Sequence, residues 1–261
     1  MTSGAINPGA FGADLHFGVS AWEEVTQRIA AGDTASASGV ALRAWDESRH
    51  RPFGARIRVM CLWPALEQVL ARDPACRTAL EARMTDTATG LRSAPAKPED
   101  VVGLAILGTL LGDAPALSLA RQAGVGIKPD EFFRSFGPVK PALTATLYFD
   151  RLGLAGIAGR ALPTLPGLLS LLESTENWDP GMESGVRAPL GAAMRRIPPD
   201  ARPPLSWDDL RRELLWGPTR DCARCLHAAG RNTDALAVLR RAAERGLEAR
   251  ARALITELGL E

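Results

Sequence analysis

The chain has 261 residues, a formal net charge of +1 at pH 7 and 23% charged residues. This balance creates no strong electrostatic field, so it argues against nucleic acid and anionic membrane surfaces as partners. The length is sufficient for one large or two small domains with a core that needs no disulfide or metal ion, and four cysteines are too few for a disulfide framework.

The chain shows no targeting segment and no membrane span. Its N-terminal stretch lacks the basic and apolar regions of a secretory signal. No window reaches the roughly 20 consecutive apolar residues that a membrane helix requires. We therefore expect a cytoplasmic protein that does not contact a membrane.

The N-terminal residues are predicted to form an arm followed by a helix. Residues 1–17 are rich in glycine and alanine and have no hydrophobic period, which predicts a flexible arm before a single α-helical domain over 18–261. Ser20 and Glu23 have the spacing of a capping box, so a helix is expected to begin at Ser20. Trp22 lies on the apolar stripe of this helix.

The next segments are predicted to be helices separated by proline. A second helix is expected over residues 34–49. The apolar run 57–70 contains Pro64, which predicts two helices or one kinked helix. A further helix follows Asp73, an N-cap residue directly before proline. It ends before the proline-rich linker 93–98, where a break between sub-domains would fall.

Residues 100–125 are the most apolar stretch of the chain, and we expect the rest of the fold to be organised around them. The run is interrupted once, at Gly112-Asp113-Ala114-Pro115, and small and aliphatic residues recur in both halves at helical spacing. This pattern predicts a buried helical hairpin. Gly124 and Gly126 at its end are expected to terminate a helix rather than to bind a dinucleotide.

The second half of the chain is predicted to be helical as well, with one long polar loop. Short helices are expected over 130–136, whose phenylalanines we assign to the core, and over 141–152. A helical pair over 153–174 is broken by two prolines. Residues 175–184 have no period and a turn signal at Asp-Pro-Gly, which predicts a polar loop.

The C-terminal helices complete an all-α prediction. A short helix is expected over 190–197, and Ser206 has the pattern of an N-cap. Two final helices are expected over 220–229 and 233–258, the second broken at Gly246. No alternating strand pattern occurs. The predicted fold is therefore a set of antiparallel helical hairpins, packed as an irregular solenoid or as a compact bundle.

One C-terminal unit resembles a tetratricopeptide repeat. In the stretch CARCLHAAGRNTDALAVLRRAAERG, Gly230 separates two apolar helices, and Ala235, Leu239 and Ala242 occupy the small and large packing positions of that family. The resemblance implies a closely packed helical hairpin. Stacked hairpins leave a concave face, and such faces commonly bind peptides or proteins.

Residues with potential chemistry form one cluster near the C-terminus. Cys222 and Cys225 have Cys-x-x-Cys spacing, and His227 follows. A zinc site would need four ligands, and no second cysteine pair exists. We therefore favour core cysteines over metal or redox ligands and expect no cofactor.

The predicted loop and a run of arginines are the candidate partner-binding residues. Tryptophan in a polar loop either packs inward or meets a partner, and the acidic residues around it are either solvated or paired with a basic surface. The arginines either form a solvated helix face or bind an acidic partner. These candidates are Glu176, Trp178, Asp179, Glu183, Arg240, Arg241 and Arg245.

The absence of catalytic motifs favours a non-enzymatic protein-interaction module that binds a protein partner through a helical groove or through the 175–184 loop. A bacterial adaptor or immunity protein, or a helper subunit of a larger enzyme, would fit. The alternative is an all-α enzyme or small-ligand-binding protein whose site brings together dispersed polar residues such as Glu176, Asp179 and His227.

Overall fold

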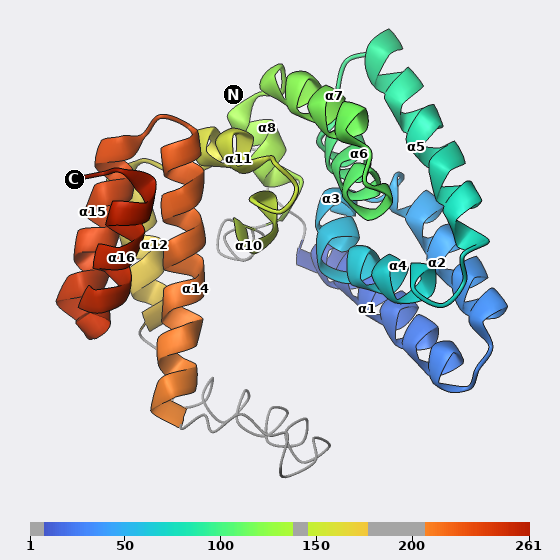
Figure 1. The fold of residues 1–261 in the computed structure, drawn as a ribbon, viewed down its shortest axis with the longest axis horizontal. Helices are drawn as coiled ribbons and strands as arrows, with labels where there is room; N and C mark the ends of the chain where they lie inside the picture. The colour runs from blue at the N-terminus through green and yellow to red at the C-terminus, as the bar shows by residue number, and fades with distance from the viewer. Residues whose placement is uncertain (1–7, 138–145, 177–206) are drawn as a thin grey trace. The chain divides into compact units, whose positions relative to one another are not determined.

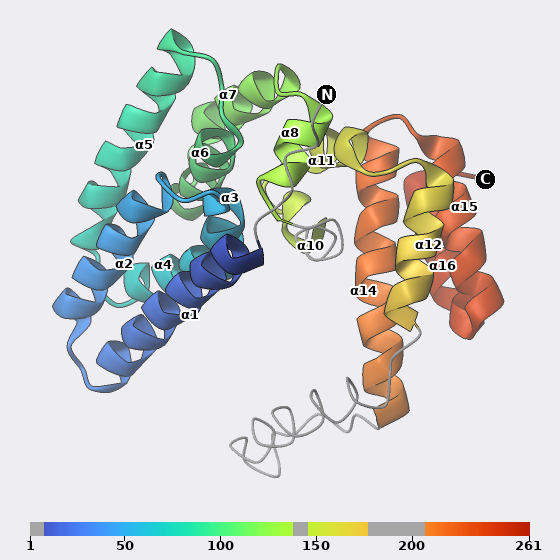
Figure 2. The same cartoon turned by 180° about the vertical axis from the view of Figure 1, so that it is seen from behind.

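The computed structural model describes residues 8–137, 146–176 and 207–261. These residues form α-helices and two π-helical turns and contain no strand, so the predicted all-α fold is confirmed for this part of the chain. The chain divides into two compact units (Figures 1 and 2). The first contains Met1–Leu162 and Arg224–Arg231, and the second contains Pro163–Ala223 and Asn232–Glu261.

The first unit opens with an antiparallel hairpin of α1 (Pro8–Ala30) and α2 (Thr34–Ser48) (Figure 1). Gly32 takes a positive φ of 80° in the turn. The Asp33 side chain then caps α2 by accepting the backbone N–H of Ser36 at 3.2 Å. The second predicted helix is thus confirmed to within a residue of its expected end.

The predicted N-terminal arm is wrong for residues 8–17, which belong to α1, while residues 1–7 lie outside the described part of the chain. Ser20 lies inside this helix and therefore does not cap its start. The cause is tertiary packing: Asp14 and Gly18 are buried, and a methyl group on Gly18 would touch Ile57 and the sulfur of Cys61 at 3.0 Å. Glycine at this position therefore permits a close approach of α1 to the following helices.

The apolar stripe predicted for this helix is only partly buried. Val25 is fully buried, but Trp22 is 40% exposed. The buried face of α1 is instead formed by Asp14, Gly18, Ala21 and Val25, which follow one another at helical spacing.

The segment around Pro64 stays helical but changes its hydrogen-bonding pattern. It comprises α3 (Gly54–Ile57), a π-helical turn η1 (Arg58–Leu62) and α4 (Trp63–Leu70). Pro64 has no N–H to donate within this continuous helical segment, and the π turn that ends at Leu62 accommodates it by changing the hydrogen-bonding pattern just before the proline. Both η1 and α4 pack against α1 and α2, so they cover one side of the α1–α2 hairpin.

The central hairpin is confirmed as α6 (Pro98–Leu111) and α7 (Ala114–Val125). Gly112 has a φ of 74°, and Asp113 caps α7 by accepting the backbone N–H of Ala116 at 2.7 Å. Every residue from 101 to 108 is buried. Helix α5 (Cys76–Ser93) packs on both helices of this hairpin, and the linker 93–98 joins α5 to α6 within the first unit.

Aromatic side chains fill the core beside this hairpin. Helix α8 (Pro129–Arg134), the turn after it and α10 (Thr146–Phe149) bring together Phe132, Phe136 and Phe149, whose ring centroids lie 5.1 to 5.6 Å apart. All three rings are at most 1% exposed, which confirms the predicted core role of Phe132 and Phe136. Such ring pairs add favourable edge contacts to the burial of apolar area.

The first unit is completed by α11 (Ala155–Ala161) and the segment Arg224–Arg231. Gly159 faces this segment so closely that a methyl group there would overlap the carbonyl oxygen of Cys225. Arg231 donates hydrogen bonds to the carbonyl oxygens of Gly159 and Leu162 at 3.0 and 2.9 Å. These bonds satisfy carbonyls that a helix leaves unpaired at its C-terminal end.

The second unit contains α12 (Leu165–Glu176), most of α14 (Trp207–Ala228), α15 (Asn232–Ala242), a π turn η3 (Ala243–Leu247) and α16 (Glu248–Leu258). The expected break at Gly246 is confirmed by its φ of 85°. The expected start of a new helix near residue 220 is wrong, because α14 continues through Pro218. Thr219 and Cys222 after this proline are buried, and this packing offsets the lost hydrogen bond.

Some predicted elements lie outside the described residues: the helix at 190–197, the cap at Ser206, the loop residues 177–184 and residues 141–145 of the helix expected over 141–152. The described remainder of that helix is α10, which ends at Phe149 rather than at residue 152. Among the residues that are described, no single helix is long and apolar enough to cross a membrane.

Candidate functional site

The candidate residues of the predicted polar loop mostly lie outside the described residues. Trp178, Asp179 and Glu183 lie outside them. Glu176 is the last residue of α12, and its side chain is not described. The proposed role of this loop therefore stays a prediction.

The arginine candidates lie on α15 and η3 beside acidic neighbours. Arg241 donates to Glu173 at 2.7 Å and to Glu244 at 3.1 Å. Its hydrogen bonds to Glu244 and Glu173 raise the pKa of Arg241. Arg240 and Arg245 are exposed. Because Arg241 already has two carboxylate partners, an acidic ligand would have to compete with both.

The cysteine cluster lies within α14 and is buried. Cys222 and Cys225 are at most 1% exposed, and His227 is half-buried. Within the described residues, no three histidine, cysteine or acidic side chains gather as metal ligands would. The two cysteines therefore occupy core positions on their helix.

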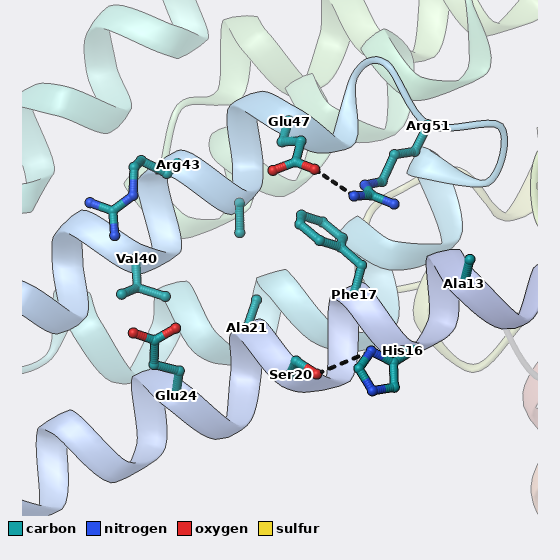
Figure 3. A pocket seen from close by; sticks show the side chains of 11 residues that line it. Ala13, His16, Phe17, Ser20, Ala21, Glu24, Val40, Arg43, Glu47 and Arg51 are labelled. Atoms are coloured by element: carbon teal, nitrogen blue, oxygen red, sulfur yellow. Dashed lines mark hydrogen bonds and ion pairs between the residues drawn. The ribbon is translucent and has the colours of Figure 1, made fainter.

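A groove lies between α1 and α2 of the first unit (Figure 3). It has a volume of about 570 Å³ and is open to solvent. It lies on the hairpin and is lined by residues from these two helices and the turn after α2. The lining residues are Ala13, His16, Phe17, Ser20, Ala21, Glu24, Val40, Arg43, Ala44, Glu47 and Arg51.

The floor of the groove is apolar and made of small side chains. Ala21, Val40 and Ala44 are between 5% and 8% exposed, so their own burial in the hairpin is nearly complete. A ligand therefore gains little from covering the floor, because the hydrophobic effect scales with the apolar area removed from water. The polar rim is therefore the part of the groove that can distinguish one ligand from another.

One end of the rim is closed by a network around Arg51. Arg51 donates to Asp14 at 3.1 Å and to Glu47 at 2.5 Å, and its guanidinium lies 3.7 Å from the ring centroid of Phe17. Asp14 also accepts the backbone N–H of Phe53 at 3.0 Å. Burial lowers the pKa of Arg51, but the hydrogen bonds to Glu47 and Asp14 outweigh this effect and leave it raised.

The other end of the rim carries a guanidinium without such a network. Arg43 is exposed and forms no hydrogen bond or ion pair with any described residue. Figure 3 shows it extending from α2 on the same side of the groove as Glu24 of α1. Glu24 is bound by Arg28 of its own helix at 2.7 Å. The nearest turn of α2 also offers no partner, because Glu47 is turned toward Arg51 (Figure 3).

Ser20 and His16 form the one contact in the groove that combines the residue types of a nucleophile and a base. The Ser20 hydroxyl lies 3.4 Å from Nδ1 of His16, one helical turn away. Ser20 lies inside α1, where backbone N–H groups are occupied by the helix, so the backbone beside it has no donor for a developing oxyanion. This geometry is that of a surface hydrogen bond between adjacent turns.

A buried arginine fixes α2 against the rest of the first unit. Arg58 is 1% exposed and donates to the Ser48 hydroxyl at 2.8 Å and to the carbonyl oxygen of Glu99 at 2.7 Å. It also lies 4.6 Å from the ring of Trp45. Gly103 makes room for it, since a methyl group there would lie 2.5 Å from the guanidinium. Burial lowers the pKa of Arg58 to about 10, with Asp100 acting in the opposite direction.

Sequence reasoning missed this groove, although part of its signal is present. His16, Ser20 and Glu24 recur every four residues on α1, and Arg43, Glu47 and Arg51 do so along α2 and the turn after it. Such spacing places each set along one side of a helix. The first set falls partly in the segment predicted as an arm, and that prediction hides its helical spacing.

Comparisons of the chain with protein-family models, with curated proteins and with solved structures gave no match. The functional proposal therefore rests on the groove itself.

Proposed function

We propose that the chain is a non-enzymatic protein-interaction module that binds its partner in the α1–α2 groove. The observation that carries this proposal is the uneven covering of the α1–α2 hairpin. One side is covered by η1 and α4, whereas the side between the rims of α1 and α2 is an open groove of about 570 Å³.

The shape of the groove supports a macromolecular ligand over a small one. Sites for small molecules usually enclose most of the surface of their ligand. This groove is open along the hairpin, and its charged groups stand on the rim rather than converging on one point (Figure 3). An adaptor, an immunity protein or a helper subunit of a larger enzyme would use such a surface in the same way.

The proposal is tested by filling the groove and comparing what the variants bind. Ser20→Trp places a large neutral side chain on the groove side of α1. Thr26→Trp is the matched control, because Thr26 is exposed on the same helix and does not line the groove. Both variants should retain the helical spectrum and unfolding midpoint of the wild type to within a few degrees.

Each purified full-length protein would be used as bait in lysate of the source organism, with quantification by mass spectrometry. A protein retained by the wild type and by Thr26→Trp, but depleted about 10-fold or more by Ser20→Trp, would support the groove as the binding site. Equal retention of every specific partner by all three baits would refute it.

A further inference from the structure

Building on the proposed function, we propose that the groove binds an α-helix of the partner protein, which directs small apolar side chains to the floor and a carboxylate to Arg43. The ligand is thus a helix, and Arg43 selects a helix that carries a carboxylate at the matching position. Three features support this: the backbone of the groove walls, the size of the floor residues and the unequal charge at the two ends of the rim.

The walls favour a helical ligand over an extended one. Both walls are α-helices, so their backbone N–H and C=O groups are already paired within each helix. An extended segment lying between them would find no strand edge, so its backbone groups could pair only with water. A helix satisfies its backbone internally and needs only side-chain contacts from the groove.

The dimensions and floor of the groove fit a short helical contact. Lining residues extend from Ala13 to Glu24 along α1, which corresponds to about 16 Å or three helical turns. The floor residues Ala21 and Ala44 have small side chains, which let a third helix approach the hairpin closely. The same fold already contains this arrangement, since α5 packs on both helices of the α6–α7 hairpin.

The charges of the rim select an acidic group at one end. At the Arg51 end, the guanidinium is neutralised by Asp14 and Glu47, so a ligand carboxylate would meet like charges. At the other end, Arg43 is exposed and has no partner among the described side chains. A carboxylate that pairs with Arg43 would contribute mainly specificity and orientation, because exposed ion pairs are weak in water.

The test is a selection from a displayed library of monomeric helical peptides with randomised surface positions. The bait is the full-length chain, either wild type or Arg43→Glu. Arg43→Gln is included as a variant that removes the charge without adding a new repulsion. Because Arg43 is exposed, both variants should fold as the wild type does.

We expect the wild type to enrich peptides with Asp or Glu at one fixed helical position beside small apolar residues. Arg43→Glu should enrich Lys or Arg at that same position. A selected acidic peptide should bind Arg43→Glu about 10-fold more weakly than the wild type, and its lysine counterpart should regain the loss. Arg43→Gln should bind both peptides with similar affinity.

The possible failures separate the two proposals. Peptides that are lost with Ser20→Trp but show no change of preference with Arg43→Glu would overturn the role of Arg43 and leave the groove as a binding site. Enrichment of proline-rich extended sequences would overturn the helical ligand. Peptides or cellular partners that bind Ser20→Trp as well as the wild type would refute the groove itself. A concentration-dependent dimer that Ser20→Trp dissociates would overturn the separate partner protein, because a second copy of the chain would then occupy the groove.

Discussion

Asp14 provides the sharpest test of the N-terminal helix, because sequence and structure assign it opposite roles. If residues 8–17 were a flexible arm, replacing Asp14 would change stability by no more than about 0.5 kcal/mol. In the structure Asp14 is 4% exposed, and it accepts hydrogen bonds from the backbone N–H of Phe53 and from Arg51.

Asp14→Ala removes both of these acceptors. Phe53 is 6% exposed, and losing the Asp14 acceptor of its buried backbone N–H costs about 1–3 kcal/mol. The partly exposed ion pair with Arg51 adds up to about 1 kcal/mol, while Glu47 still neutralises the guanidinium. We therefore expect Asp14→Ala to reduce the free energy of unfolding by about 1–4 kcal/mol.

Two companion variants distinguish this explanation from a general loss of helix. Asp14→Asn keeps an acceptor for the Phe53 N–H and should cost only about 1 kcal/mol. Gly12→Ala should stabilise the protein by about 0.5–1 kcal/mol, because Gly12 lies inside α1 with open space around it. Urea unfolding followed by circular dichroism measures the free energy of unfolding of all three variants. The dependence of this free energy on urea concentration should be the same as in the wild type. No effect of Asp14→Ala together with no effect of Gly12→Ala would refute the helix over residues 8–17.

Three further predictions concern the cores of the first unit. Gly159→Ala should destabilise the protein by about 1–3 kcal/mol because the added methyl group overlaps the carbonyl oxygen of Cys225. Gly90 is exposed with open space around it, so Gly90→Ala should stabilise the protein by about 0.5–1 kcal/mol. Thermal unfolding should therefore show a lower midpoint for Gly159→Ala and a higher one for Gly90→Ala. Phe132→Ala should cost about 3–5 kcal/mol in urea unfolding, since the ring is fully buried, and a cost below about 1 kcal/mol would exclude it from the core. Burial raises the pKa of Cys61 from 9.0 to about 11, so the folded state favours the neutral thiol. The contribution of the neutral thiol to the free energy of unfolding is present below pH 9 and is lost as the pH rises to 11. Measured against Cys61→Ala at each pH, the wild type should lose about 2–3 kcal/mol over this range. Parallel curves of stability against pH for the two proteins would contradict this expectation.

The fold is most predictable from the sequence where local chemistry decides the backbone. Gly112 and Asp113 together specify a left-handed turn and an N-cap, and the α6–α7 hairpin forms there. Gly246 likewise marks the predicted break before α16. At these positions glycine permits a left-handed backbone that other residues disfavour, so the residue type marks the turn in the sequence.

The wrong predictions fall where packing outweighs local preference. The glycine-rich start of α1 resembles a loop in composition, but Gly18 lets the helix approach Ile57 and Cys61 closely, and Asp14 is held by residues after α2 that are distant in sequence. Pro218 normally ends a helix, yet buried residues on the following turn keep α14 continuous. Neither compensation can be deduced from a window of neighbouring residues.

The groove illustrates the same limit for the candidate site. The sequence pattern places Trp22 on an apolar stripe, but it is among the exposed large apolar side chains. A helix start at Ser20 separates this residue from His16, although the two lie on adjacent turns of α1. The groove exists only once α1 includes residues from Ala13 onward and packs along α2. A site built from two helices therefore cannot be predicted while one of them is assigned the wrong start.

The different charge pairing at the two ends of the groove rim also results from tertiary contacts. Glu47 stands one helical turn from Arg43 and one turn from Arg51, so spacing alone allows it to pair with either. Phe17 and Asp14 of α1 hold the guanidinium of Arg51 in place, and Glu47 binds there. Arg43 is left without a carboxylate as a consequence. Asp14→Asn leaves Glu47 as the carboxylate that neutralises Arg51, so Glu47 should stay there and an acidic helical peptide should bind this variant as tightly as the wild type. Weaker binding of the peptide would mean that Glu47 has moved to Arg43 and that Asp14 is needed to keep it at Arg51.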